Sequence, residues 1–155
     1  MDHHHEESEI AKFFDNKSVF ITGATGFMGK VLVEKLLRSC PGIKNIYLLL
    51  RSKKGLNAGQ RLDELFNAKI FDHLNHKSSS ARNKVLPIAG DIAEPGLGIS
   101  EHDMQKLINE VHVVFHSAAT VKFDEPLRAS IQYNVLGTRR VIQLCHKMTN
   151  LKVQT

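Results

Sequence analysis

The 155-residue sequence predicts an α/β fold, with a doubly wound parallel sheet covered by helices on both faces. Three observations predict it. Short, continuously apolar runs alternate five times with segments of helical apolar spacing. A glycine-rich turn joins the first apolar run to the first helical segment. Right-handed crossovers between parallel strands then give the doubly wound, Rossmann-type order.

Composition favours one globular domain and excludes several other classes. Apolar residues make up 42% of the chain and the formal net charge is +5. A basic balance fits an anionic ligand, but the basic residues are scattered and Trp is absent, so we expect no nucleic-acid partner. No apolar run reaches membrane-spanning length and no targeting signal is seen. Cys40 and Cys145 are expected to be reduced thiols facing the cytosol.

Residues 1–16 are polar and are expected to form an N-terminal tail outside the domain. This stretch contains the three consecutive histidines His3, His4 and His5. Consecutive histidines do not preorganise tetrahedral ligands, so we predict no metal site here or elsewhere.

The first βαβ unit is predicted from residues 18 to 50. Residues 18–21 are continuously apolar apart from Ser18, as in a buried parallel strand. A loop over 23–29 leads into a helix whose apolar face spans 31–37 and which ends near Cys40-Pro41-Gly42. The next buried strand spans 45–50.

The middle of the chain is predicted to contain one helix and one strand. Residues 52–59 form a loop, and apolar residues at helical spacing then predict a helix from Leu62 to Leu74. Residues 75–83 are rich in Ser, Lys and His and are expected to be a surface loop. The third strand spans 85–89.

The last third adds two helices and two strands. Ser100, with Asp103 three residues later, predicts a helix start, and we expect this helix to run through Val111. A strand follows at 113–116 and a helix at 131–148. A fifth strand begins at Leu151, and the chain stops within it, so we expect the sheet to be truncated there.

The turn after the first strand reads G-x-x-G-x-x-G and is preceded by a threonine. Glycines here permit a tight turn, close approach of a pyrophosphate and close packing of the helix on the sheet. Phosphates can then bind free N–H groups at the helix N-terminus. Incidental glycines in a turn are the alternative, but a glycine turn between a strand and a helix is typical of dinucleotide binding. The predicted cofactor-binding residues are Thr22, Gly23, Thr25, Gly26, Phe27, Met28 and Gly29.

The end of the second strand predicts which nicotinamide cofactor is bound. An NAD site has an acidic residue at this position, which binds the ribose 2′-hydroxyl. Here the strand is followed by Arg51, whose guanidinium could pair with a 2′-phosphate. We therefore predict NADPH and interpret residues 17–155 as an incomplete NADP-binding domain. A solvated strand-end cation is the alternative interpretation of Arg51.

Residues after the third and fourth strands are further candidates. Asp91 could accept a hydrogen bond from the adenine amino group and Ile92 could flank the ring, although Asp91 could equally be a turn residue. The small residues Ala118 and Ala119 would let the cofactor lie against the backbone. We interpret His116 as a packed or hydrogen-bonded core residue.

Several longer runs resemble the fatty acyl-CoA reductases, which are extended short-chain dehydrogenases. The resemblance covers nearly all of the chain from about residue 13. The runs Leu36–Pro41 and Ala118–Phe123 are more specific than the glycine loop and distinguish the chain from sugar-nucleotide epimerases. The similar runs are 22–32, 36–41, 48–51, 69–72, 115–125 and 134–139.

The resemblance implies NADPH-dependent reduction of a long-chain acyl-CoA to a primary alcohol. It also implies membrane attachment, peroxisomal or at the endoplasmic reticulum, only through a C-terminal part absent from this chain. Family members use a Tyr-x-x-x-Lys pair for protonation, and neither Tyr47 nor Tyr133 has a Lys four residues later. Asn134 matches the helix Asn of the family, a supporting residue for catalysis. We therefore expect this chain to be inactive alone.

Two other functions remain open from the sequence. The chain could be a non-catalytic NADP(H)-binding module. It could also belong to another extended short-chain dehydrogenase, such as a sugar-nucleotide epimerase, because fold alone does not fix function.

Overall fold

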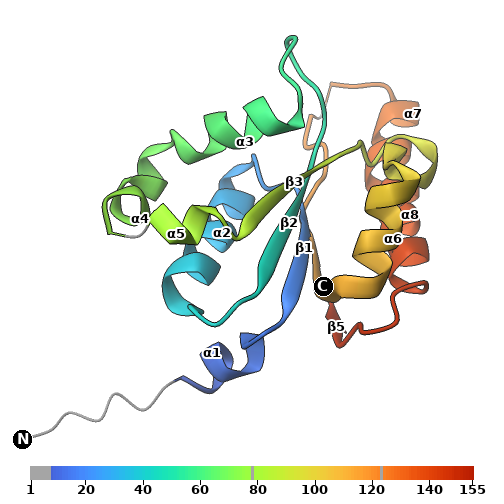
Figure 1. Cartoon of the computed structure of the whole chain (residues 1–155). Coiled ribbons are helices and arrows are strands. Elements are labelled where there is room, and N and C mark those ends of the chain that lie inside the picture. Colours follow the sequence, from blue (N-terminus) through green and yellow to red (C-terminus); the bar gives the residue numbers. More distant parts are fainter. Residues whose placement is uncertain (1–7, 78, 123) are drawn as a thin grey trace, which may run out of the picture.

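The computed structural model describes residues 8–77, 79–122 and 124–155, and it confirms the α/β fold. Five parallel strands form one sheet in the order β3-β2-β1-β4-β5 (Figure 1). The strands are β1 (Ser18–Thr22), β2 (Asn45–Leu50), β3 (Val85–Ala89), β4 (Val111–His116) and β5 (Val153–Gln154).

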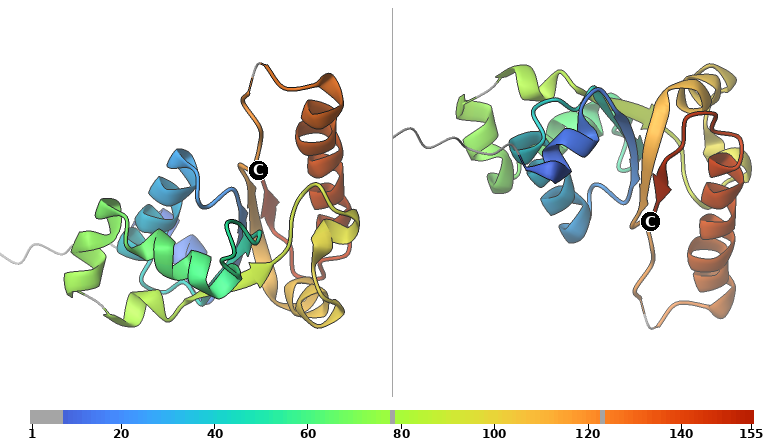
Figure 2. Two further views of the ribbon diagram at one scale, coloured as in Figure 1. Left: turned by 90° about the horizontal axis from the view of Figure 1, so that it is seen from above. Right: turned by 90° about the horizontal axis from the view of Figure 1, so that it is seen from below.

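Helices cover both faces of the sheet, as Figure 2 shows from above and below. Alternate β1 residues belong to two apolar clusters on opposite faces of the sheet. Val19 and Ile21 lie in one cluster and Phe20 lies in the other. The first face carries α2 (Phe27–Ser39), α3 (Ala58–Phe66), the 3₁₀ turn η1 (Lys69–Phe71), α4 (Asp72–Lys77) and α5 (Ser79–Arg82). The second carries the 3₁₀ turn η2 (Pro95–Gly98), α6 (Glu101–Glu110), α7 (Leu127–Ser130), the π segment η3 (Ile131–Leu136) and α8 (Gly137–Cys145).

The chain changes direction across the sheet at β1. From β1 it moves outward to β2 and β3, and it then returns to place β4 on the other side of β1. Thr22, the last residue of β1, pairs in register with His116, the last residue of β4. The carboxyl ends of these two strands therefore flank the switch point at which such sheets bind ligands.

Helix α2 begins earlier than predicted. It starts at Phe27, inside the predicted 23–29 loop, because Gly26 is extended (φ −76°, ψ 173°) and acts as its N-cap. The helix ends at Ser39, immediately before the predicted stop.

The single helix predicted over 62–74 is wrong, because the segment breaks after Phe66. Ala68 is extended, and η1 and α4 follow as separate turns. The break changes which side chains after Phe66 are buried. Phe71 is fully buried against Phe66, whereas Ile70 is 36% exposed. The predicted 75–83 loop is also wrong, since it contains the end of α4 and all of α5.

Several boundaries in the last third also differ. Val111 is extended (φ −83°, ψ 135°) and belongs to β4, whereas α6 ends at Glu110. Ser100 caps α6 as predicted, its Oγ accepting the Asp103 N–H at 3.2 Å. The predicted 131–148 helix starts earlier, with α7, contains the π segment η3, and ends at Cys145.

The predicted polar tail is partly a helix. Helix α1 spans Glu9–Phe14, and both Ala11 and Phe14 are buried, with Phe14 in the core cluster beside α2. The expectation of a tail therefore fails for these residues. His3, His4 and His5 lie outside the described residues.

Candidate functional site

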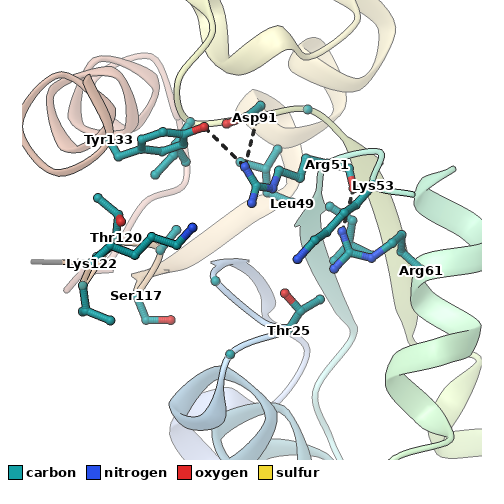
Figure 3. Close-up of a pocket in the computed structure, with 18 of the residues that line it drawn as sticks. Thr25, Leu49, Arg51, Lys53, Arg61, Asp91, Ser117, Thr120, Lys122 and Tyr133 are labelled. Carbon is teal, nitrogen blue, oxygen red and sulfur yellow. Dashed lines mark hydrogen bonds and ion pairs between the residues drawn. The ribbon is translucent and has the colours of Figure 1, made fainter. Parts of the chain in front are cut away.

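A pocket of about 520 Å³ opens at the carboxyl ends of β1 to β4. Figure 3 shows basic side chains entering it from several sides. Eight of the predicted site residues line the pocket: Gly23, Thr25, Gly26, Arg51, Asp91, Ile92, Ala118 and Ala119. Thr22, Phe27, Met28, Gly29 and Asn134 are not among its lining residues.

Two glycines of the turn are required by backbone geometry. Gly23 has φ +77°, and a Cβ there would lie 2.6 Å from the Ala118 nitrogen. A Cβ on Gly29 would lie 2.1 Å from the Gly23 carbonyl oxygen. Any side chain at these positions would push the loop away from β4 or the helix away from the loop.

The N-terminus of α2 faces this turn without a side-chain cap. Gly26 offers none, and the first turn of this 13-residue helix contains no acidic residue. Phe27 and Met28 are 82% and 68% exposed and do not line the pocket, so only their backbone N–H groups at the helix start are candidates for binding. Such uncapped N–H groups suit a phosphate.

Basic side chains gather where β2 ends. Arg51, Lys53 and Arg61 all line the pocket, and Arg61 Nη1 donates to the Arg51 carbonyl oxygen at 2.9 Å. Figure 3 shows the three side chains close together, with Arg51 directed toward Asp91 and Tyr133. Arg51 Nη1 lies 3.3 Å from the Tyr133 hydroxyl and 3.8 Å from Asp91 Oδ2.

Arg61 is the functional candidate that sequence reasoning missed. It is only 8% exposed, and its Nε has no hydrogen-bond partner among the described residues, with Glu64 Oε2 at 3.6 Å. This guanidinium lines the pocket and forms an ion pair with Glu64, so it adds a buried positive charge beside Arg51. The signal was an arginine on the apolar face of α3, one turn before Leu65.

Asp91 fits both interpretations made from the sequence. Its Oδ1 accepts the Ala93 N–H at 2.9 Å, which makes it a turn residue, while Oδ2 faces Arg51 in the pocket. Ile92 lines the pocket and is 6% exposed. A contact between these residues and adenine stays a prediction.

His116 is hydrogen-bonded on both ring nitrogens, which agrees with its interpretation as a core residue. Nδ1 lies 2.6 Å from the Thr22 hydroxyl and Nε2 lies 3.1 Å from the Thr138 hydroxyl. Burial lowers the pKa of His116 below its ordinary value. Thr22 is fully buried and also accepts the Ala118 N–H at 3.3 Å, so it supports the pocket wall from behind.

Asn134 lies in the π segment, outside the pocket. Its amide group binds the backbone of Thr120 twice, accepting from the Thr120 nitrogen at 2.9 Å and donating to its oxygen at 3.0 Å. Glu125 adds a third contact, accepting the Thr120 hydroxyl at 3.0 Å. Asn134 therefore fastens the loop after β4 to the helix, and a direct part in catalysis stays a prediction.

Within the described part of the chain, no helix is both long and apolar enough to cross a membrane. Among those same residues, no three His, Cys, Asp or Glu side chains gather as metal ligands would. Cys40 and Cys145 are both buried and free.

Comparison with known families identifies a match over most of the chain. The family described as male sterility protein, a class of NAD-binding domains, matches residues 21–155. Fatty acyl-CoA reductase 1 of Mus musculus is 43% identical over 144 residues, which cover 93% of this chain. A putative fatty acyl-CoA reductase of Drosophila melanogaster is 47% identical over 145 residues. The chain spans about 28% of the length of each.

Two of the solved structures that share this fold are reductase domains of biosynthetic enzymes. The terminal R domain from the myxalamid biosynthetic pathway superposes with a TM-score of 0.72 at 30% identity, over 90% of this chain and 34% of that one. The reductase domain of a nonribosomal peptide synthetase from Mycobacterium tuberculosis gives 0.69 at 30% identity, over 90% and 32%. These neighbours share the fold of a reductase cofactor domain.

Proposed function

Because the chain belongs to the male sterility protein family, whose members similar to it include fatty acyl-CoA reductases, we propose that it binds NADPH for reduction of a long-chain acyl-CoA to a fatty alcohol. The part of the relatives that this chain matches contains the glycine loop and the basic pocket. The chain spans about 28% of those relatives, so the whole reaction is proposed for a protein of their length.

The basic group at the end of β2 is the observation that carries the choice of NADPH. A 2′-phosphate bears up to two negative charges, and the three cations Arg51, Lys53 and Arg61 enter one pocket. Ribose hydroxyls alone would not need them. Planar guanidinium groups also match phosphate oxygens in bidentate fashion.

The remaining residues would hold the cofactor by backbone contacts. The uncapped start of α2 suits the pyrophosphate, and Gly23 lets the glycine loop pack closely against Ala118 after β4. Two molecules of NADPH, bound one after the other, would supply the two hydrides that take the thioester to the alcohol with release of CoA. This chain contributes orientation of that cofactor, and we propose that the proton donor is a Tyr-x-x-x-Lys pair outside the chain.

The reaction is tested by incubating the product of the complete reading frame with NADPH and palmitoyl-CoA, followed by product analysis. We expect hexadecanol from that protein and no acyl-CoA-dependent NADPH consumption from the 155-residue chain. Turnover of a nucleotide sugar without acyl-CoA reduction would instead support an epimerase. Reduction of palmitoyl-CoA by the short chain alone would contradict the placement of the proton donor.

We also propose attachment to a peroxisomal or endoplasmic-reticulum membrane through a part outside this chain, as the resemblance implies. Fractionation of cells expressing the complete reading frame tests this. Recovery of the protein in the cytosolic fraction alone would contradict it.

A further inference from the structure

The pocket wall after β4 is held by a chain of hydrogen bonds that passes through His116. This wall, Ser117 to Thr120, lines the pocket and contains no regular secondary structure. It is fastened at Ala118, whose N–H donates to the Thr22 hydroxyl, and at Thr120, which Asn134 binds twice. The Ala118 contact connects to the imidazole through Thr22, and the Thr138 hydroxyl connects the imidazole to the backbone carbonyl oxygen of Asn134, whose side chain binds Thr120.

The direction of each hydrogen bond follows from counting protons. Thr138 donates its only hydroxyl proton to the backbone carbonyl oxygen of Asn134 at 2.7 Å. Its oxygen can therefore only accept from His116, so Nε2 must carry a proton. A neutral ring then leaves Nδ1 as an acceptor, which takes the Thr22 hydroxyl proton.

The result is one continuous sequence of donors and acceptors. It runs from the Ala118 N–H through Thr22, His116 and Thr138 to the Asn134 carbonyl, and every hydroxyl proton is used once. Such a chain tolerates only one tautomer and one charge state of the ring. Protonation of Nδ1 would leave the fully buried Thr22 hydroxyl proton without its acceptor.

We propose that His116 is a positioning residue of the cofactor site: the neutral Nε2–H tautomer aligns the Ser117–Thr120 wall, and protonation of the ring weakens cofactor binding. This inference rests on the proposed function, because it needs the pocket to hold NADP(H). Gly23, Thr25 and Gly26 of the glycine loop line the pocket themselves, whereas His116 acts through Thr22 and Thr138.

Among the described residues, the two ring nitrogens are bound by hydroxyl groups, and one charged group, the α-carboxylate of Thr155 in this chain, binds the His116 backbone. From β1 the partner is Thr22 and from α8 it is Thr138, while the His116 backbone N–H donates to Thr155 on the β5 side. The charged residues that follow Thr138 on α8 are Arg139, which is exposed, and Arg140, whose Nη1 binds the carbonyl oxygens of Ile92 and Gln132. Burial alone lowers the pKa of His116, which favours the neutral ring at neutral pH.

His112 provides a matched control at the opposite end of the same strand. Its Nδ1 accepts the Ser18 N–H at 3.2 Å, and its pKa is also lowered, first by burial and then by Lys17. It does not line the pocket. If acid acts on the fold as a whole, replacement of either histidine should change the pH dependence of cofactor binding. If acid acts on the Ser117–Thr120 wall, only replacement of His116 should change it.

The test is NADP⁺ affinity between about pH 7.5 and about pH 5 for the wild type, His116→Asn and His112→Asn. In His116→Asn, the amide oxygen of the new side chain can replace Nδ1 as acceptor but cannot be protonated in this range. We expect the wild type to lose about tenfold more affinity on acidification than His116→Asn, with His112→Asn following the wild type. Titration of the 2′-phosphate near pH 6 affects all three proteins equally, so it cancels when their losses of affinity are compared.

A second measurement, ¹⁵N NMR of the wild-type imidazole without cofactor, reports the tautomer directly and does not depend on any variant folding. Protonation at Nε2 is expected, and protonation at Nδ1 would overturn the proposal. Equal pH profiles for the wild type and His116→Asn would also overturn it while leaving NADP⁺ binding intact. Failure of the wild type to bind NADP⁺ at neutral pH would instead overturn the proposed function and this inference with it.

Discussion

Single residues at the end of β2 decide which cofactor the pocket prefers. An acidic residue there would accept the ribose hydroxyl of NADH and repel a phosphate. We propose that Arg51 reverses that preference; the buried Arg61 contacts it by donating to the Arg51 carbonyl oxygen. Without a phosphate, Arg51 is occupied by the Tyr133 hydroxyl and Asp91, so a bound 2′-phosphate would compete with these two partners.

Replacement of Arg51 should weaken NADPH selectively. In Arg51→Ala we expect an affinity loss of about 1.5–3 kcal/mol for NADPH, which is about ten- to a hundredfold, and little change for NADH. Isothermal titration with both cofactors measures this. Arg128→Ala, outside the pocket, is the matched control. Equal losses for both cofactors would mean that Arg51 does not contact the 2′-phosphate.

Replacement of Gly29 should affect folding as well as binding. A Cβ at this position meets the Gly23 carbonyl oxygen at 2.1 Å, so Gly29→Ala must displace α2 or the loop. We expect a loss of about 1–3 kcal/mol in the free energy of unfolding, measured by urea denaturation. Gly59→Ala on α3 is the control, because its nearest neighbour lies 3.4 Å away. Equal stability of the two variants would contradict the close packing of α2 on the loop.

At the scale of elements, the pairing of β1 with β4 is supported by a histidine at each end. His112 accepts from the Ser18 backbone and His116 from the Thr22 hydroxyl, both through an unprotonated Nδ1. The pKa of each is lowered by burial. The pair of strands that frames the switch point is therefore sensitive to acid at both ends.

The free energy of unfolding should decrease as the pH drops below about 6.5. The unfolded histidines bind protons near that pH, whereas the folded ones bind them only at lower pH, so the unfolded state carries more protons in between. The stabilisation is complete above the unfolded pKa and is lost as the pH falls through the folded pKa. Urea denaturation between about pH 7.5 and 5 measures this, and the double variant His112→Asn, His116→Asn should show a flatter slope. An unchanged slope would assign the acid sensitivity to other groups.

The strands and the glycine loop were predictable from the sequence because their signals are local. Buried parallel strands are continuously apolar, and Gly23 and Gly29 mark a turn that no other residue fits. The break after Phe66 was not predictable, because the apolar spacing continues through it and only packing selects Phe71 over Ile70. Arg61 was missed for the same reason, since its importance depends on where α3 lies relative to β2.

At the scale of the whole molecule, the topology brings separate parts of the sequence to one pocket. The glycine loop after β1, the cations after β2, Asp91 after β3 and the wall after β4 all lie at the carboxyl edge of the sheet. The sheet order makes β1 and β4 neighbours, although β1 ends at Thr22 and β4 begins only at Val111. That arrangement, rather than any single motif, makes the pocket suitable for a dinucleotide.

The relative affinity of the wild-type chain for NADPH and NADH tests the central claim most directly. Both cofactors share the adenine, the pyrophosphate and the nicotinamide, so the ratio of their dissociation constants isolates the 2′-phosphate. Isothermal titration at neutral pH and moderate salt should give NADPH at least about tenfold tighter binding. Equal affinities, or tighter binding of NADH, would contradict the account of the basic pocket at the end of β2.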